Sequence, residues 1–156
     1  MPGQWEGMRV DDHPTGAPID APEFNRRMHA LVPLSGQLGI VATAMRPDGS
    51  ATARLPYLPA FVRPGGSVSG PAIMALADVA IFAGVNARIG WTPMALTANL
   101  NTTFLKPPQP EDLIAEADVL RFGRRLAVYA VRIVSASAPM EVVAHATGSY
   151  ALPGSR

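Results

Sequence analysis

The pattern of hydrophobic and polar residues first picks out one long apolar segment. Residues 70–88 show no polar face at helical spacing, and from Pro71 to Val85 the only charged residue is Asp78. Ser69 stands where a helix N-cap is expected, and Pro71 is tolerated in the first turn of a helix. A helix that is apolar on all sides must be surrounded by other elements. The pattern therefore predicts one long buried helix.

Segments of alternating polarity lie on both sides of this helix. Alternation with a period of two is typical of β-strands. We expect two strands before the helix and four after it, at residues 37–46, 50–58, 94–105, 112–122, 126–135 and 141–152. Turn signals at 47–49, at 123–125 and near Ala138-Pro139 predict that several of these strands are joined as antiparallel hairpins.

The beginning of the chain has a different character. Residues 1–19 contain six Pro or Gly residues and little periodicity, which predicts a flexible leader. Asp20 then offers an acidic cap, and the apolar spacing that follows predicts a short amphipathic helix over 21–31. Pro33 is expected to end this segment. No basic region leads into an apolar one, so we expect no secretory signal and a cytoplasmic protein.

Together these elements predict one α+β domain over residues 20–156, in which an antiparallel β-sheet wraps around the long helix. A chain of 156 residues can build a sizeable core as a single domain. Apolar residues make up 48% of the chain and charged residues only 16%. This surface is poor in charge for a monomer, so we expect some apolar surface to be buried between subunits of an oligomer.

Charge and residue content bear on the partners. The formal net charge is +1 and no long run of Lys or Arg is present, so no nucleic-acid partner is expected. The chain has no Cys, and its three His share no metal-ligand spacing, so no metal is expected. The apolar run is too short for a membrane span and is interrupted by Asp78, so no membrane partner is expected.

Asp78 is the principal candidate for chemistry. Taking a carboxylate out of water is costly unless the group is paired or used. One interpretation is a structural carboxylate that caps backbone groups or pairs with an arginine at a subunit interface. The other is a catalytic group, and the residue pattern by itself leaves both open.

The surroundings of Asp78 resemble the hotdog-fold acyl-CoA thioesterases, and more closely the phenylacetate-pathway group. In that group a His-Gly-Gly opens the central helix and an Asp follows nine residues after the His. Here Ser69-Gly70-Pro71 occupies the tripeptide and Asp78 falls at the Asp position. The resemblance covers roughly residues 36–152, and the further matching segments are 97–107, 112–117 and 123–127. It implies a hotdog fold.

The resemblance also implies hydrolysis of an acyl-CoA thioester to a free acid and coenzyme A. Asp78 would act as the general base for water or as the nucleophile. The backbone N–H of Gly70, at the positive end of the helix dipole, would hold the carbonyl oxygen. Thr97 aligns with a Ser or Thr that orients the attacking water. Coenzyme A is part of the substrate, so no separate cofactor is expected.

Further substrate contacts follow from the same resemblance. The family His is Ser69 here, the second Gly is Pro71, which has no N–H, and an Asn before the His is Arg63. Arg63 could polarise a carbonyl or reach a substrate carboxylate. The basic residues that could hold the coenzyme A phosphates are Lys106, Arg124 and Arg125. The structural alternatives are an ordinary N-cap at Ser69, a helix entry at Gly70, a sheet residue at Thr97 and a solvated hairpin tip at 124–125.

The spacing of Gly70 and Asp78 has a geometric consequence. Eight residues on one helix span roughly 12 Å along its axis. Groups that act on one carbonyl carbon must lie within about 3–3.5 Å of it. The mechanism therefore requires a homodimer, with Gly70 from one subunit and Asp78 from the other, as the resemblance also implies. We expect two such dimers to form a homotetramer, and their packing mode and the acyl group, aromatic or medium aliphatic, are left open.

Two other functions are alternatives. The first is a non-catalytic hotdog domain that binds or senses acyl-CoA, which the residues at positions 63 and 69 keep open. The second is a hotdog hydratase or dehydratase. Such enzymes need a His paired with a carboxylate for proton transfer, and no His lies near Asp78 in the sequence. The hydratase is therefore less favoured.

Overall fold

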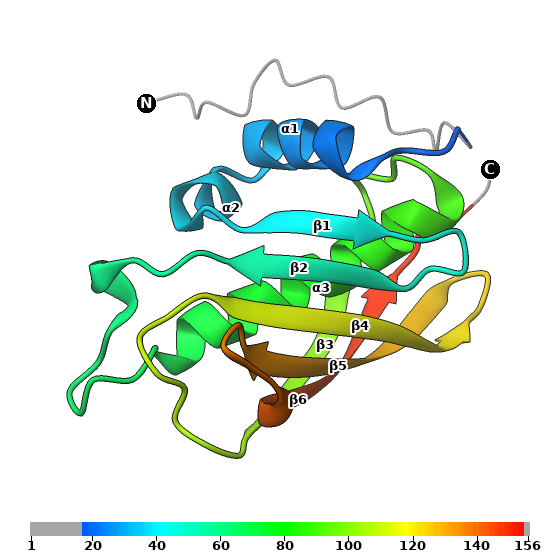
Figure 1. The fold of residues 1–156 in the computed structure, drawn as a ribbon. Coiled ribbons are helices and arrows are strands. Elements are labelled where there is room, and N and C mark those ends of the chain that lie inside the picture. The colour runs from blue at the N-terminus through cyan, green and yellow to red at the C-terminus, as the bar shows by residue number, and fades with distance from the viewer. Residues whose placement is uncertain (1–16, 155–156) are drawn as a thin grey trace, which may run out of the picture.

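A six-stranded antiparallel sheet wraps around helix α3 (Gly70–Ile89) in the computed structural model, which describes residues 17–154 (Figure 1). The spatial order of the strands is β1-β2-β4-β5-β6-β3. Their bounds are β1 (Val41–Met45), β2 (Ala51–Leu55), β3 (Leu96–Phe104), β4 (Leu113–Phe122), β5 (Leu126–Ser135) and β6 (Ala138–Ala151). This arrangement confirms the predicted α+β class and hotdog fold. The predicted leader lies almost wholly outside the described residues.

Helix α3 forms the centre of the core. Eleven of its twenty residues are buried, and they pack against the inner face of the sheet. The close approach needs glycine at position 84, because a Cβ there would lie 2.4 Å from the carbonyl oxygen of Gly49 and 2.8 Å from the ring of Tyr129. The predicted helix is confirmed and ends one residue later than expected, at Ile89.

Helix α3 is also the one helix within residues 17–154 that is long and apolar enough to cross a membrane. The mean hydropathy of its most apolar 18-residue window is 1.6, and 67% of this window is buried inside the protein. A helix packed against a sheet has this composition because most of its surface is removed from water.

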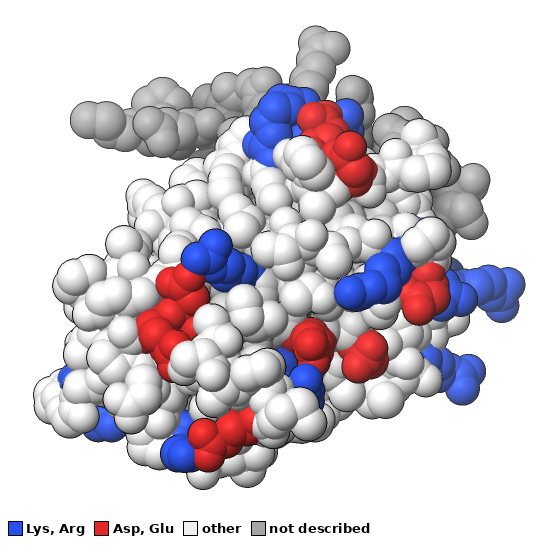
Figure 2. All heavy atoms as spheres, in the orientation of Figure 1, with Lys and Arg blue, Asp and Glu red and all other residues white. Residues whose placement is uncertain are grey.

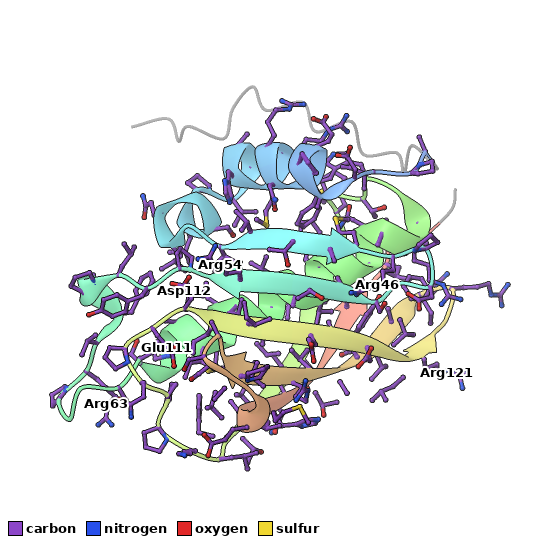
Figure 3. All side chains as sticks on the ribbon, in the orientation of Figure 1. Arg46, Arg54, Arg63, Glu111, Asp112 and Arg121 are labelled. Carbon is purple, nitrogen blue, oxygen red and sulfur yellow. The ribbon has the colours of Figure 1, made fainter. Side chains whose placement is uncertain are left out.

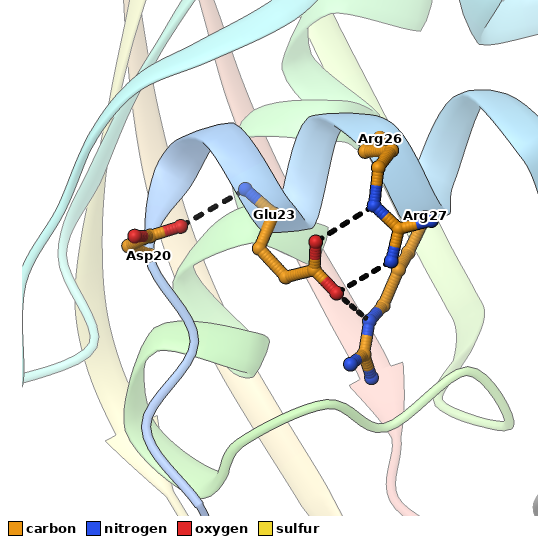
Figure 4. Close-up of polar contacts among 4 residues, drawn as sticks. All are labelled: Asp20, Glu23, Arg26 and Arg27. Carbon is orange, nitrogen blue, oxygen red and sulfur yellow. Dashed lines mark hydrogen bonds and ion pairs between the residues drawn. The ribbon is translucent and has the colours of Figure 1, made fainter.

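The first helix begins where the sequence predicts. Asp20 caps α1 (Ala21–Leu31) by accepting a hydrogen bond of 2.9 Å from the backbone N–H of Glu23 (Figure 4). The Glu23 carboxylate in turn accepts hydrogen bonds from Arg26 and Arg27. These two guanidinium groups lower the pKa of Glu23 to about 2. The capping carboxylate and the first-turn carboxylate both lie at the positive end of the helix.

The chain after α1 differs from the prediction. Pro33 opens a second helix, α2 (Pro33–Leu38), instead of leading to a strand. Proline is favoured at the first position of a helix because its missing N–H would have no partner there. Gly39, with a φ of 68°, ends α2, so β1 begins at Val41 and the expected strand start at 37 is wrong. A short 3-10 helix, η1 (Pro59–Phe61), was also not predicted.

The turn before the last strand lies earlier than expected. It falls at residues 136–137, so that Pro139 lies inside β6 rather than in the turn. The carboxylate of Glu111 fixes this position, because it accepts hydrogen bonds from the backbone N–H of Ser137 at 3.2 Å and from its hydroxyl at 2.7 Å. Neither contact is visible in the local sequence pattern.

Strand β3 is an exposed edge of the sheet. It pairs only with β6 in the described chain, and seven of its nine residues are exposed. Leu96 is 59% exposed and Phe104 is 50% exposed. The strand expected at 94–105 is confirmed as β3, and in a single chain both of its faces are largely exposed. An open edge that carries large apolar side chains is a surface suited to a second chain.

The outer face of the sheet carries charges of both signs. Figure 2 shows acidic and basic side chains in mixed groups, separated by wide uncharged areas. Two of the ion pairs join neighbouring strands or their ends, Arg132 to Glu116 and Arg54 to Asp112. On the face shown, the described residues therefore form no large patch of one sign, as a nucleic-acid surface would.

Asp112 ties the end of β2 to the start of β4. Its carboxylate accepts hydrogen bonds from the backbone N–H of Tyr57 at 2.7 Å and from Arg54 Nε at 2.8 Å. Figure 3 shows Arg54 and Asp112 side by side at this end of the sheet. The Tyr57 N–H and then the Arg54 guanidinium hold the pKa of Asp112 below its ordinary value of 3.8.

We predict that Asp112→Asn lowers the free energy of unfolding at pH 7 by about 1–2 kcal/mol, since it weakens a charged hydrogen-bond pair. The folded-state pKa is depressed, so the stabilisation is present above pH 3.8 and is lost as the pH falls through the folded-state value. Urea unfolding of both proteins at several pH values measures this. A difference that stays constant down to pH 2 would contradict the assignment.

Candidate active site

The carboxylate of Asp78 lies midway along α3 and is held by two hydroxyl groups. Thr97 Oγ1 and the Tyr150 hydroxyl each donate a hydrogen bond of 2.8 Å to its Oδ1 atom. Within residues 17–154, no side chain or backbone group donates to Oδ2. One carboxylate oxygen is thus fixed in place while the other is free to accept a proton or to attack.

The sheet brings the two hydroxyl groups together. Thr97 near the start of β3 and Tyr150 near the end of β6 are directly paired in register. The register shifts between Thr97 and Asn99, a bulge of the kind that redirects side chains next to functional sites. The sequence-based expectation for Thr97 was a contact to water. In the structure its hydroxyl is bonded to the Asp78 carboxylate.

Tyr150 is a site residue that the sequence did not reveal. It is only 3% exposed, and its ring stacks on Phe82 with centroids 5.9 Å apart and planes at 20°. Burial, and then the negative charge of Asp78, raise the pKa of Tyr150 well above its ordinary value. The phenol therefore stays protonated and remains a donor to Asp78. Its strand pairing with Thr97 is the only signal for this role, and that pairing joins distant parts of the chain.

We predict that Tyr150→Phe lowers kcat by about tenfold and changes KM less, because the carboxylate loses one of two donors. Steady-state hydrolysis of the thioester that the resemblance implies as substrate measures both constants, and thermal unfolding checks that the fold is kept. Thr97→Ser is the matched control, since it keeps a hydroxyl at the other donor position and is expected to retain most of the activity. An unchanged kcat in Tyr150→Phe would limit the phenol to a structural role.

Asp78 opens into a cavity of about 180 Å³, here called the Asp78 pocket. Its walls come from α1, α2 and α3, from the segment before β3 and the first residues of β3, and from the end of β6. Most of the lining side chains are apolar. They are Met28, Val32, Ser35, Asp78, Val79, Phe82, Pro93, Ala95, Leu96, Thr97 and Tyr150.

A second cavity of about 340 Å³, here called the Gly70 pocket, lies at the start of α3. It is lined by Arg63, Ser67, Val68, Gly70, Ile73, Phe104, Leu105, Lys106, Pro107 and Pro108. The Phe104 ring lies against Gly70, since a Cβ added there would be 3.3 Å from a ring carbon. A side chain at position 70 would therefore project into this pocket.

The first turn of α3 offers free backbone donors. Within the described chain, the N–H groups of Gly70 and Ala72 have no hydrogen-bond partner, and Pro71 has no N–H. Ser69 occupies the N-cap position, but its side chain makes no capping hydrogen bond. Free N–H groups at the positive end of a helix are suited to an oxygen that carries or develops negative charge.

Only some of the other predicted site residues lie near a pocket. Arg63 and Lys106 line the Gly70 pocket, where Lys106 also forms an ion pair with Glu141. Ser69 and Pro71 flank Gly70 but line neither pocket. Both arginines of the turn between β4 and β5, Arg124 and Arg125, are exposed.

These two arginines lie far from Gly70 on the same chain. The turn that holds them follows Phe122, whose ring packs under the Arg88 guanidinium at 4.7 Å. Arg88 belongs to the last turn of α3, whereas Gly70 is its first residue. Figure 1 likewise shows the β4–β5 turn at the end of the sheet opposite the start of α3. Within one chain, Arg124 and Arg125 are not brought to the Gly70 pocket.

Gly70 and Asp78 are also kept apart. The Gly70 pocket and the Asp78 pocket have no lining residue in common. A single chain therefore presents the free N–H of Gly70 and the Asp78 carboxylate at two separate cavities. In the part of the chain that the structure describes, no group of three or more His, Asp or Glu residues could hold a metal ion.

Comparison with known sequences relates the chain to a family. The model of the thioesterase superfamily matches residues 65–139, a segment that contains Gly70, Asp78 and Thr97. No functionally curated protein matches the chain. Among solved structures, a protein of Silicibacter sp. TM1040, provisionally assigned as a thioesterase, is 31% identical. The alignment covers 86% of this chain and 92% of that protein, with a TM-score of 0.76.

Two further solved structures are similar to this chain. The PaaI protein from the phenylacetic acid degradation operon of E. coli is 25% identical over 83% of this chain and 90% of its own, with a TM-score of 0.72. A phenylacetic acid degradation-related protein of Ralstonia eutropha JMP134, also provisionally assigned as a thioesterase, is 27% identical. That alignment covers 80% of this chain and 97% of the other, with a TM-score of 0.68. The chain belongs to the thioesterase superfamily, and it is a hotdog protein of the PaaI-like kind.

Proposed function

We propose that this thioesterase hydrolyses an acyl-CoA, with the thioester carbonyl held between Asp78 of one subunit and Gly70 of its partner. The observation that carries the proposal is the geometry of Asp78. Two donors fix one oxygen of its carboxylate, and the other oxygen faces a largely apolar pocket without a partner in the described chain. One oxygen of this carboxylate thus ties α3 to β3 and β6, and the other is left available for a reaction.

The chemistry follows from these groups. Asp78 Oδ2 accepts a proton from water as the water oxygen attacks the carbonyl carbon, or attacks that carbon itself. The carbonyl oxygen gains negative charge, which the free N–H of Gly70 at the helix N-terminus stabilises. The C–S bond then breaks, and the coenzyme A thiolate takes up the proton that came from the water. Where Asp78 itself attacks, breakage of the C–S bond leaves an anhydride on Asp78, and a water molecule then hydrolyses it. The products are the free carboxylic acid and coenzyme A.

A homodimer would bring Gly70 of one chain close to Asp78 of the other, which a single chain cannot do. Edge strand β3 has an open side and exposed apolar residues, so a second copy can pair along it and extend the sheet. A two-fold axis makes such a contact the same for both chains. The two α3 helices then run in opposite directions, which is the arrangement that can bring the start of one helix toward the middle of the other. Each dimer would hold two complete sites.

The coenzyme A portion of the substrate fits the Gly70 pocket. Arg63 and Lys106 line it, and a guanidinium or ammonium group is suited to phosphate. Arg63 is exposed and has no ion-pair partner within residues 17–154, so it is available to a ligand. Arg124 and Arg125 can contribute only from the partner subunit, because their own Gly70 lies at the opposite end of α3.

The test is a thiol-release assay with a panel of aromatic and aliphatic acyl-CoAs, combined with measurement of acyl-CoA binding by calorimetry. Hydrolysis of one or more members supports the proposal. Binding of acyl-CoA without release of thiol would overturn it in favour of a binding or sensing domain. Measuring the mass of the protein in solution tests the dimer, since a strictly monomeric active protein would contradict the shared site.

A further inference from the structure

The turn between α3 and β3 leads directly to one of the two hydroxyl groups that hold Asp78. It comprises residues 90–95, and β3 begins at the next residue. Pro93 and Ala95 of this turn line the Asp78 pocket, as does Thr97 just beyond it. The place of the Thr97 hydroxyl therefore depends on how the turn is held against the helix.

Asn86 holds this turn to α3. It is the only fully buried polar residue of the helix, with 0% exposure. Its side-chain oxygen accepts a hydrogen bond of 2.7 Å from the backbone N–H of Thr92, and its side-chain NH₂ donates one of 2.8 Å to the carbonyl oxygen of Phe82. A buried amide that is bonded at both ends is costly to disturb, because its partners lose their hydrogen bonds as well.

One route leads from Asn86 to the first donor of Asp78. The carbonyl oxygen of Thr92 accepts a hydrogen bond of 3.1 Å from the N–H of Ala95, which closes the turn. Two residues later, Thr97 pairs with Tyr150 of β6 and donates to Asp78 Oδ1 at 2.8 Å. Thr97 is thus fixed by the anchored turn on one side and by strand pairing on the other.

A second route leads to the other donor. Trp91, next to Thr92, is 7% exposed, and its ring lies edge-on against Phe82 with centroids 6.2 Å apart. Phe82 in turn stacks on Tyr150, which donates to Asp78 Oδ1 at 2.8 Å. Closely packed side chains transmit a shift of one ring to the next. Both donors to Asp78 therefore depend on the position of the same turn.

We infer that Asn86 is a positioning residue, which places the Thr97 and Tyr150 hydroxyl groups on the Asp78 carboxylate. The inference rests on the proposed function, in which these donors leave one carboxylate oxygen available. Asn86 lines neither the Asp78 pocket nor the Gly70 pocket, so it acts through other residues. A misplacement of about 1 Å that begins far from the reacting atoms is enough to slow a reaction strongly.

The experiment removes the side-chain amide with and without the donors in place. Asn86→Leu keeps a similar size and loses both hydrogen bonds, so kcat is expected to fall about tenfold while KM changes by less than about threefold. In the Thr97→Val/Tyr150→Phe protein, Asn86→Leu is expected to change kcat by less than about twofold, because no donor is left to position. Asn86→Ser is the second variant if the leucine protein does not fold, with the same pattern expected.

Thr92→Val is the matched control in the same turn. It removes the hydroxyl that donates to the carbonyl oxygen of Gly90 at 3.0 Å and keeps the backbone N–H that bonds to Asn86. It is expected to lower Tm and to leave kcat within about twofold of the wild type. Fluorescence reports on the turn without an activity assay. In a Trp5→Phe protein, Trp91 is the only tryptophan, and Asn86→Leu is expected to increase its quenching by acrylamide.

The outcomes separate the inference from the proposed function. An equal loss of kcat with and without the two donors would limit Asn86 to a structural role and overturn the inference. A loss no larger than that of Thr92→Val, or unchanged quenching of Trp91, would overturn it as well. Absence of hydrolysis by the wild type with every acyl-CoA of the panel would instead overturn the proposed function, and with it the positioning role.

Discussion

Asp78→Asn is expected to lower kcat for thioester hydrolysis by about 10²–10⁴-fold, the usual contribution of a catalytic acid or base. The amide is close in shape to the carboxylate, and its oxygen can still accept hydrogen bonds from Thr97 and Tyr150. It cannot accept a proton from water or act as a nucleophile. KM is expected to change much less than kcat. Steady-state thiol release with the best acyl-CoA of the panel measures both constants.

Asp118→Asn is the control for this substitution. Asp118 is an exposed residue of β4 and lines neither pocket, so its loss is expected to leave kcat within twofold of the wild type. Thermal unfolding of both variants shows whether the fold is kept. If Asp78→Asn remains as active as Asp118→Asn, the carboxylate is a structural group and the mechanism proposed here is wrong.

The sequence predicted those parts of the fold that depend on local pattern. Helix α3 and strand β5 follow from apolar spacing and turn residues that lie within a few positions of one another, and β5 has the predicted bounds. Helix α2 was missed because Pro33 is as well suited to opening a helix as to ending one. The early start of β6 depends on Glu111, 26 residues away from the turn it holds.

Fewer residues of the candidate site than of the fold could be predicted from the sequence. Asp78 stands out because it is the only charge in a long apolar run, a property of the local pattern. Tyr150 does not stand out, since it is one aromatic residue in a strand and reaches Asp78 only through the pairing of β3 with β6. Long-range strand pairing therefore decides this contact.

The second large effect is expected from dimers that carry two different substitutions. Gly70→Val fills the Gly70 pocket beside the free N–H, and the half-exposed Phe104 ring next to it can move aside. Gly70→Val and Asp78→Asn homodimers are each expected to be nearly inactive. A heterodimer with one substitution on each chain keeps one intact site of two, namely Gly70 from the Asp78→Asn chain and Asp78 from the Gly70→Val chain. Its activity is expected to be about half that of the wild type.

The same two substitutions placed on one chain give the decisive control. When a doubly substituted chain pairs with a wild-type chain, each shared site contains one altered residue, so this heterodimer is expected to be nearly inactive. A site contained within a single chain predicts the reverse, with half the activity in the second heterodimer and none in the first. Co-expression with two affinity tags yields each heterodimer for the assay. The comparison separates a shared site from an internal one because both heterodimers hold the same residues and differ only in which chain carries them.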